Sequence, residues 1–199
     1  ASQGDKKDWV YDLEIALLRN EIDMAVHSGK DVPVDIESGT ELTSVLQREN
    51  PLDVFVGKFD SKLQRRICFD EVPQGGIIGT ASLRRRAFLL SLRSDLQIVD
   101  HRGNVTTRLK KLEESPDLHG IILACAGLKR LELTDLDYES FAPAQILPAV
   151  NQGTIAAQMR SESADIKELL SAIVDPPTQA MFLAERTCAI VLQGDCNSS

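Results

Sequence analysis

Apolar and polar positions follow a helical period at the start of the chain and a strand period after it. Across residues 8–20, apolar side chains recur at Trp9, Leu13, Ala16 and Leu17. This spacing predicts an amphipathic helix, with acidic residues in its first half, where the helix dipole favours them. Short apolar segments bounded by polar or turn residues then predict strands at 22–26, 41–46 and 53–57.

From residue 75 onward, apolar segments of strand length alternate with segments of helical period. The predicted strands are 75–79, 96–100, 120–127 and 154–160, and the predicted helices are 80–92, 105–115, 128–133, 164–173 and 179–192. Such alternation is typical of parallel α/β sheets. The sequence therefore predicts the α/β class. A change of local character at "RENP" (48–51) predicts two lobes.

Composition narrows the range of partners. The 199 residues carry 22 Lys and Arg against 30 Asp and Glu, which gives a formal net charge of -8. This excess argues against DNA or RNA as a partner of the whole surface but leaves a local basic site open. No apolar run is as long as a membrane span, and no signal peptide is recognised. We therefore expect a cytoplasmic monomer with no nucleic-acid or membrane partner.

The four cysteines are Cys68, Cys125, Cys188 and Cys196. They form no CxxC motif and have no regular spacing, which predicts reduced thiols rather than a disulfide framework. Cys125 and Cys188 lie in apolar segments and are expected to pack in the core. Cys196 follows a helix on a glycine-containing segment, which predicts an accessible thiol. We expect no metal site.

Arginines occur where the predicted strands are followed by helices. Arg84 and Arg85 follow one strand, Arg102 and Arg108 follow the next, and Arg130 follows a third. In open parallel sheets, ligands bind beyond the carboxyl ends of the strands, where helix N-termini present free N–H groups. A guanidinium group binds carboxylate or phosphate through two N–H donors. The pattern predicts a site for a small molecule with several anionic groups, although a solvated helix face is the alternative for any single arginine.

Six segments resemble, in this order, successive motifs of the porphobilinogen deaminase (hydroxymethylbilane synthase) family. They are "AVHSGKDVP", "GTASLRRRAFLL", "DHRGNVTTRLKKL", "IILACAGLKRL", "LPAVNQG" and "LAERTCAIVLQGDC". The resemblance covers nearly the whole chain. It implies two lobes similar to those of type II periplasmic binding proteins, with an active cleft between them, and a small third α/β domain. Domain 1 would comprise 1–49 and 154–172, domain 2 would comprise 54–150, and domain 3 would begin within 176–199.

The resemblance also implies a reaction. Members of this family join four porphobilinogen molecules head to tail in tetrapyrrole (heme) biosynthesis, releasing ammonia each time and forming hydroxymethylbilane. They use a dipyrromethane cofactor held by a thioether to one cysteine, which would be Cys196 here. Each pyrrole carries an acetate and a propionate. The anionic ligand expected from the arginines would therefore be the cofactor and the substrate.

Residue roles follow from the match to these motifs. Asp31 in "KDVP" would be the catalytic carboxylate, stabilising the positive charge left when ammonia departs and handling protons at the pyrrole nitrogens. Lys30 and Ser28 would contact cofactor or substrate, and His27 is either a structural histidine or a ligand contact. The implied cofactor-binding residues at the strand-to-helix junctions are Thr80, Ser82, Arg84, Arg85, Arg102, Asn104, Arg108 and Arg130. Arg160 is a weaker candidate.

A non-catalytic module of the same two-lobed build, binding a small polycarboxylate, is the competing hypothesis. The presence of both Asp31 and Cys196 favours the enzyme, because a binder needs neither. The two glycines that the family has before the cysteine are Gly194 and Asp195 here, which favours the binder. Asn151 stands where the family has glycine, at a position where backbone freedom matters. Nucleic-acid binding through "SLRRR" is disfavoured because no aromatic stacking platform accompanies the arginines.

Overall fold

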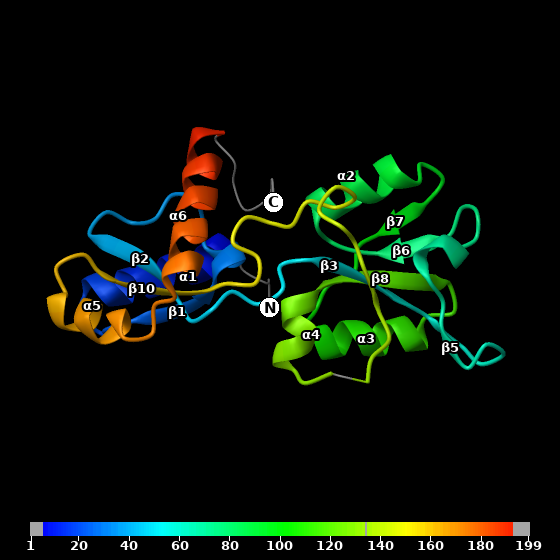
Figure 1. The fold of residues 1–199 in the computed structure, drawn as a ribbon, viewed down its shortest axis with the longest axis horizontal. Helices are drawn as coiled ribbons and strands as arrows, with labels where there is room; N and C mark the ends of the chain where they lie inside the picture. Colours follow the sequence, from blue (N-terminus) through cyan, green and yellow to red (C-terminus); the bar gives the residue numbers. More distant parts are fainter. Residues whose placement is uncertain (1–5, 134, 193–199) are drawn as a thin grey trace. The chain divides into compact units, whose positions relative to one another are not determined.

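The structure, a computed structural model, describes residues 6–133 and 135–192, with the side chains described from Trp9 onward. The chain forms two compact units, Ala1–Glu49 with Ala149–Ser199, and Asn50–Pro148 (Figure 1). Each unit has its own sheet with helices packed on it, so the predicted α/β class is confirmed. The three domain ranges given above stay a prediction. No helix within the described part of the chain is long and apolar enough to cross a membrane.

The first unit is built on an antiparallel sheet in the order β1-β10-β2. Its elements are α1 (Lys6–Leu18), β1 (Ala25–Ser28), a 3-10 turn (Gly29–Asp31), β2 (Thr40–Val45), β10 (Ile155–Arg160), α5 (Ala164–Ser171) and α6 (Pro176–Val191). Alternate residues of β10 point to opposite faces. Ala157 and Met159 therefore pack with Leu170 of α5 on one face. On the other, Gln158 donates to Glu14 Oε1 of α1 (N···O 2.7 Å).

The second unit has five strands in the order β7-β6-β8-β3-β9. Its elements are β3 (Asp53–Gly57), β4 (Phe59–Asp60), β5 (Arg65–Arg66), a 3-10 turn (Phe69–Glu71), β6 (Ile77–Gly79), α2 (Leu83–Leu92), β7 (Gln97–Val99), α3 (Val105–Glu114), β8 (Leu118–Ala124), α4 (Cys125–Arg130) and β9 (Glu139–Ser140). The short β4 and β5 form a separate hairpin.

Three layers make up this second unit, with α2 on one face of the sheet and α3 and α4 on the other (Figure 1). Phe55 and Ile122 face α2 and pack with its Leu89. Their neighbours on the same strands, among them Val56, pack instead with Leu112 of α3. This alternation is the two-residue period of a strand buried on both faces.

Three expectations need correction. The predicted parallel sheet holds for β6, β7 and β8, but β3 runs antiparallel to β8, and the sheet of the first unit is antiparallel throughout. The strand predicted for 120–127 ends at Ala124, because α4 begins at Cys125, which is nevertheless buried as expected. Cys188 is exposed, since α6 buries the face that carries Phe182 and Ala189. The adjacent residue lies about 100° round the helix from Ala189.

The turn at Asn151 has a backbone conformation that favours glycine or asparagine. Asn151 is fully buried and has φ 57°, in the left-handed region. Asparagine adopts this conformation more readily than other residues with a side chain. Its backbone N–H donates to Glu185 Oε2 of α6 (N···O 2.6 Å), which fixes the turn in place.

We predict that Asn151→Ala is less stable than Asn151→Gly, because both variants remove the amide but only alanine is strained at positive φ. The difference in the free energy of unfolding should be about 1 kcal/mol. Urea unfolding of the two variants measures it. Equal stability would show that the backbone conformation at 151 is not what requires this residue type.

Candidate functional site

The turn that carries Lys30 and Asp31 is fixed by close packing at Gly29. The Gly29 N–H donates to the Thr154 carbonyl (N···O 3.0 Å), and a Cβ placed on Gly29 would lie 2.1 Å from Thr154 Oγ1. Any larger residue would require Thr154, which directly precedes β10, to shift. Lys30 and Asp31 are partly exposed directly after this contact, and Ser28, at the end of β1, is exposed. The sequence "SGKD" therefore presents a cation and a carboxylate on a rigid turn.

Neighbouring side chains hold the chain on both sides of Asp31. Arg186 of α6 donates to the carbonyls of Pro33 and Val34 (N···O 2.9 Å each). Before the turn, the His27 ring lies 3.0 Å from Gln158 Oε1, and burial lowers the pKa of His27. Of the two alternatives for His27, a structural histidine and a ligand contact, a hydrogen bond to the sheet favours the structural histidine. Arg160, the weaker candidate, donates to the carbonyls of Leu17 and Ile22 (2.9 and 2.8 Å).

In the second unit, the segment before α2 is built by short polar side chains. Thr80 is buried, and its Oγ1 accepts a hydrogen bond from the Ser82 N–H (3.2 Å). Ser82 is the N-cap of α2, and its Oγ accepts from the Arg85 N–H (3.3 Å). The two hydroxyls thus place Arg84 and Arg85 on the first turn of the helix.

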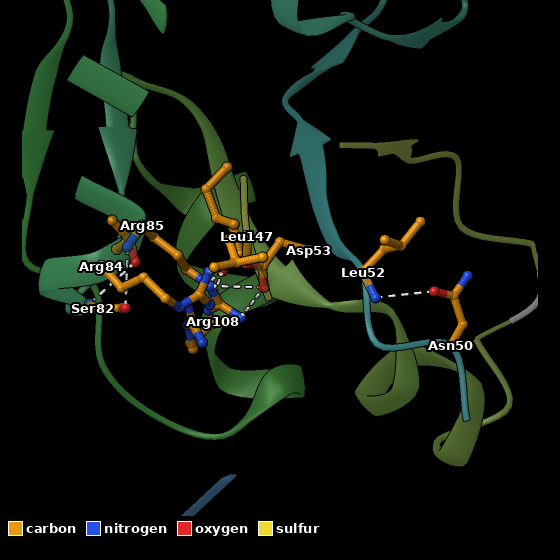
Figure 2. A network of polar contacts seen from close by, with 10 residues as sticks. Asn50, Leu52, Asp53, Ser82, Arg84, Arg85, Arg108 and Leu147 are labelled. Atoms are coloured by element: carbon orange, nitrogen blue, oxygen red, sulfur yellow. Dashed lines mark hydrogen bonds and ion pairs between the residues drawn. The ribbon is translucent and has the colours of Figure 1, made fainter. Parts of the chain in front are cut away.

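Arg84 and Arg85 converge on a buried carboxylate, Asp53, at the start of β3 (Figure 2). Arg85 donates to Asp53 Oδ1 through Nε and Nη2 (3.0 and 2.6 Å), and Arg84 Nη1 lies 2.7 Å from Oδ2. The Asp53 side chain is 0% exposed. Burial raises its pKa, but the charges of Arg85 and Arg84 outweigh that effect and hold the pKa below its ordinary value.

Arg108, on the first turn of α3, joins the same cluster (Figure 2). Its Nη2 and the Nη1 of Arg85 both donate to the Ile122 carbonyl (2.8 and 3.2 Å). Burial, followed by the charge of Arg85, lowers the pKa of Arg108 to about 10, so the group is still cationic at neutral pH. Burial also lowers the pKa of Arg84. We name Asp53, Arg84, Arg85 and Arg108 the arginine cluster.

The arginine cluster has more positive charge than its carboxylate neutralises. Three guanidinium groups against one carboxylate leave an excess of two positive charges. The Nε atoms of Arg84 and Arg108 are buried and have no hydrogen-bond partner within the described part of the chain. Buried unpaired donors are costly, and an anion would satisfy both the charge and the donors. The cluster therefore has the donor set of a carboxylate-binding site.

The remaining predicted residues stand on other segments of the two units. Asn104 is the N-cap of α3 and accepts from the Thr107 N–H (2.8 Å). Arg102 has a side chain that is 68% exposed, 3.5 Å from Asp100, and Arg130 is exposed at the end of α4. Ser28, Lys30 and Asp31 belong to the first unit, and the cluster belongs to the second. Cys196 lies outside the described residues.

Sequence reasoning missed Asp53. It stands at the start of the apolar segment "DVFVG", where an aspartate is read as the end of a turn. The clue in the sequence was the negative charge of Asp53 at the edge of an apolar strand that could be buried on both faces. A carboxylate buried there needs a cationic partner.

The family model described as "Porphobilinogen deaminase, dipyromethane cofactor binding domain" matches residues 1–168. The chain belongs to the porphobilinogen deaminase family. Porphobilinogen deaminases of Desulforudis audaxviator and Clostridium botulinum are each 44% identical to it, over 98% of this chain. The match covers 61% and 64% of those two proteins, so the chain spans about three fifths of their length.

Solved structures with similar folds are more distant. They include an arginine transport system periplasmic binding protein from Legionella pneumophila, with 16% identity and a TM-score of 0.45 over 89% of this chain and 76% of that one. A sulfate-bound OxyR2 regulatory domain from Vibrio vulnificus has 14% identity and a TM-score of 0.42, over 87% of this chain and 77% of that one. At such TM-scores the family assignment rests on the sequence matches alone.

Membership in the porphobilinogen deaminase family bears on the predicted cofactor. The matched domain is the one that binds dipyrromethane, so the cofactor prediction is confirmed for the domain family. Attachment through Cys196 stays a prediction, as do the individual site residues.

We predict that the arginine cluster contributes to acid sensitivity. Because the folded-state pKa of Asp53 is lowered, its ionisation stabilises the fold above the unfolded-state value of 3.8, and this contribution is lost as the pH falls through the folded-state value. Below about pH 4, wild type should therefore lose melting temperature more steeply than Asp53→Asn. Thermal melts across acidic pH test this, and parallel curves would contradict it.

Proposed function

We propose that this chain is the cofactor-binding and condensing part of a porphobilinogen deaminase, joining four porphobilinogen molecules head to tail into hydroxymethylbilane with release of ammonia. The observation that carries the proposal is the arginine cluster, with its excess of two positive charges and two buried Nε–H groups that have no partner among the described residues. Porphobilinogen and dipyrromethane carry an acetate and a propionate on every pyrrole. Such carboxylates are the natural partners of guanidinium donors.

The arginines, the helix-capping residues and Cys196 have different roles in this function. Arg84, Arg85 and Arg108 supply the positive field that holds pyrrole carboxylates, and the exposed Arg102 and Arg130 extend it. Thr80, Ser82 and Asn104 support the helix ends on which these arginines stand. When bound, dipyrromethane would supply the pyrrole end to which substrate is joined, and Cys196 would hold it through a thioether.

Asp31 would handle charge and protons. Head-to-tail joining breaks the carbon–nitrogen bond of one aminomethyl group, forms a carbon–carbon bond to the next pyrrole, and moves a proton from that ring carbon to the departing amine. Positive charge develops on the pyrrole that loses ammonia, and a fixed carboxylate stabilises it. The rigid turn at Gly29 holds Asp31 for this purpose, and Lys30 and Ser28 would orient a substrate carboxylate beside it.

Intact mass followed by peptide mapping tests the proposal. Incubation with porphobilinogen should add the mass of two linked pyrroles to the peptide that contains Cys196. Trypsin leaves Cys188 and Cys196 on one peptide, because no Lys or Arg lies between them. Cys188→Ser, which removes an exposed thiol on α6, should keep the adduct, and Cys196→Ser should lose it. An adduct that persists in Cys196→Ser would overturn the attachment, and no adduct at all would favour the non-catalytic binder.

We predict that Asp31→Asn keeps the fold and the adduct but slows ammonia release by about 100-fold or more. Asp35→Asn is the matched control, because Asp35 is exposed four residues along the same segment. Ammonia released per minute and the melting temperature are measured for both variants. Turnover at the wild-type rate in Asp31→Asn would exclude the catalytic role.

We predict that Arg102→Lys weakens porphobilinogen binding about tenfold without changing the melting temperature, because lysine lacks the planar fork and the side chain is exposed. Arg86→Lys, an exposed change on α2, is the control and should leave affinity unchanged. Calorimetric titration gives the affinities. A fall in melting temperature that accounts for the lost affinity would indicate a structural arginine instead.

A further inference from the structure

The three arginines of the cluster differ in how their donors are used. Every nitrogen of the Arg85 guanidinium has a protein partner, since Nε and Nη2 donate to Asp53 and Nη1 donates to the Ile122 carbonyl. Arg84 reaches Asp53 and the Leu147 carbonyl through Nη1, and Arg108 reaches the Ile122 carbonyl through Nη2. Their Nε atoms are the buried donors without a partner among the described residues. Each guanidinium nitrogen of Arg85 thus has a partner, while Arg84 and Arg108 keep their Nε donors for a ligand.

Asp53 is the group that creates this difference. It lies on β3, between the two sheet neighbours β8 and β9, and is fully buried, so its position is set by the sheet. Its Oδ1 accepts two hydrogen bonds from Arg85, and its Oδ2 forms an ion pair with Arg84 Nη1 at 2.7 Å. A buried ion pair is stabilising only when its geometry is good, and here the fork of Arg85 provides that geometry.

We propose that Asp53 is a positioning residue, which fixes Arg84 and Arg85 so that the arginine cluster stays cationic and keeps donors of Arg84 and Arg108 for a dicarboxylate ligand. The inference rests on the proposed function for the identity of that ligand. A single carboxylate among three guanidinium groups cannot neutralise them. Its effect is to set their geometry while leaving the cluster cationic.

Charge and geometry predict opposite results for Asp53→Asn, which makes the test decisive. Removing the carboxylate raises the excess from two positive charges to three, and attraction between charges alone would tighten anion binding. If Asp53 positions the arginines, affinity for porphobilinogen should instead fall about tenfold or more, because the donors are no longer held in place. Affinity equal to or tighter than that of wild type overturns the proposal.

Asp95→Asn is the matched control. Asp95 also holds an arginine, Arg93, in the second unit (N···O 2.6 Å), but at the surface and away from the cluster. This variant should bind porphobilinogen as wild type does. Equal weakening in both variants would mean that loss of any such ion pair disturbs the unit, and would overturn a specific role for Asp53.

Two probes separate failure of this inference from failure of the proposed function. If wild type binds inorganic phosphate but not porphobilinogen, the proposed function fails, and the Asp53→Asn comparison is then made with phosphate. If wild type binds porphobilinogen and Asp53→Asn binds it as tightly, only the role of Asp53 fails. Binding of neither probe overturns both.

A measurement on wild type alone covers the case in which Asp53→Asn does not fold. Nitrogen-15 NMR of the arginine Nε–H groups should show the Arg84 and Arg108 signals moving when the anion is added. The Arg85 signal should stay in place, because its Nε already donates to Asp53. A shift of Arg85 as large as those of Arg84 and Arg108 would overturn the division between holding and binding arginines.

Discussion

The buried contact between Asp53 and the guanidinium groups of Arg84 and Arg85 is the interaction on which the chemistry of the second unit depends. Taking guanidinium groups out of water is unfavourable unless a partner compensates the lost hydration. Asp53 compensates two of them partly, and Arg108 contributes a third charge, which donates to the Ile122 carbonyl. The second unit therefore contains buried positive charge that its own carboxylate does not neutralise, and an anionic ligand would be stabilised there. A protein with a net charge of -8 over its whole chain concentrates the opposite sign at one place.

Local structure sets the geometry of this cluster before any ligand is present. Thr80 and Ser82 bond to backbone N–H groups at the start of α2, and Asn104 does the same at the start of α3. These caps satisfy helix N-termini and fix which residues stand on each first turn. The sequence predicted that these three side chains bind the ligand, and this stays a prediction. Among the described residues they bond to the backbone, and they place the arginines that follow.

Arginine at successive strand-to-helix junctions could be predicted because both the strand period and the residue type are visible in the sequence. The difference between Arg85, which is buried and bonded to Asp53, and Arg102, which is exposed, could not be predicted, because both follow a strand and carry the same side chain. What divides them is Asp53, and its burial depends on β3 pairing with β8 and β9 at long sequence separation. The exposure of Cys188 has a similar origin, since the packing of α6 decides which of its apolar faces is covered.

The turn that carries Asp31 depends on a part of the chain beyond the family match. Glu185 and Arg186 are adjacent on α6, about 100° apart round the helix, so they reach different segments. Glu185 binds Arg48 and the Asn151 N–H, and Arg186 binds the carbonyls of Pro33 and Val34. Asn151 in turn packs against Gly29, at the start of the Asp31 turn. Residues 1–168 match the cofactor-binding domain, yet α6 must be folded on this unit for the carboxylate to be held where the proposed reaction requires it.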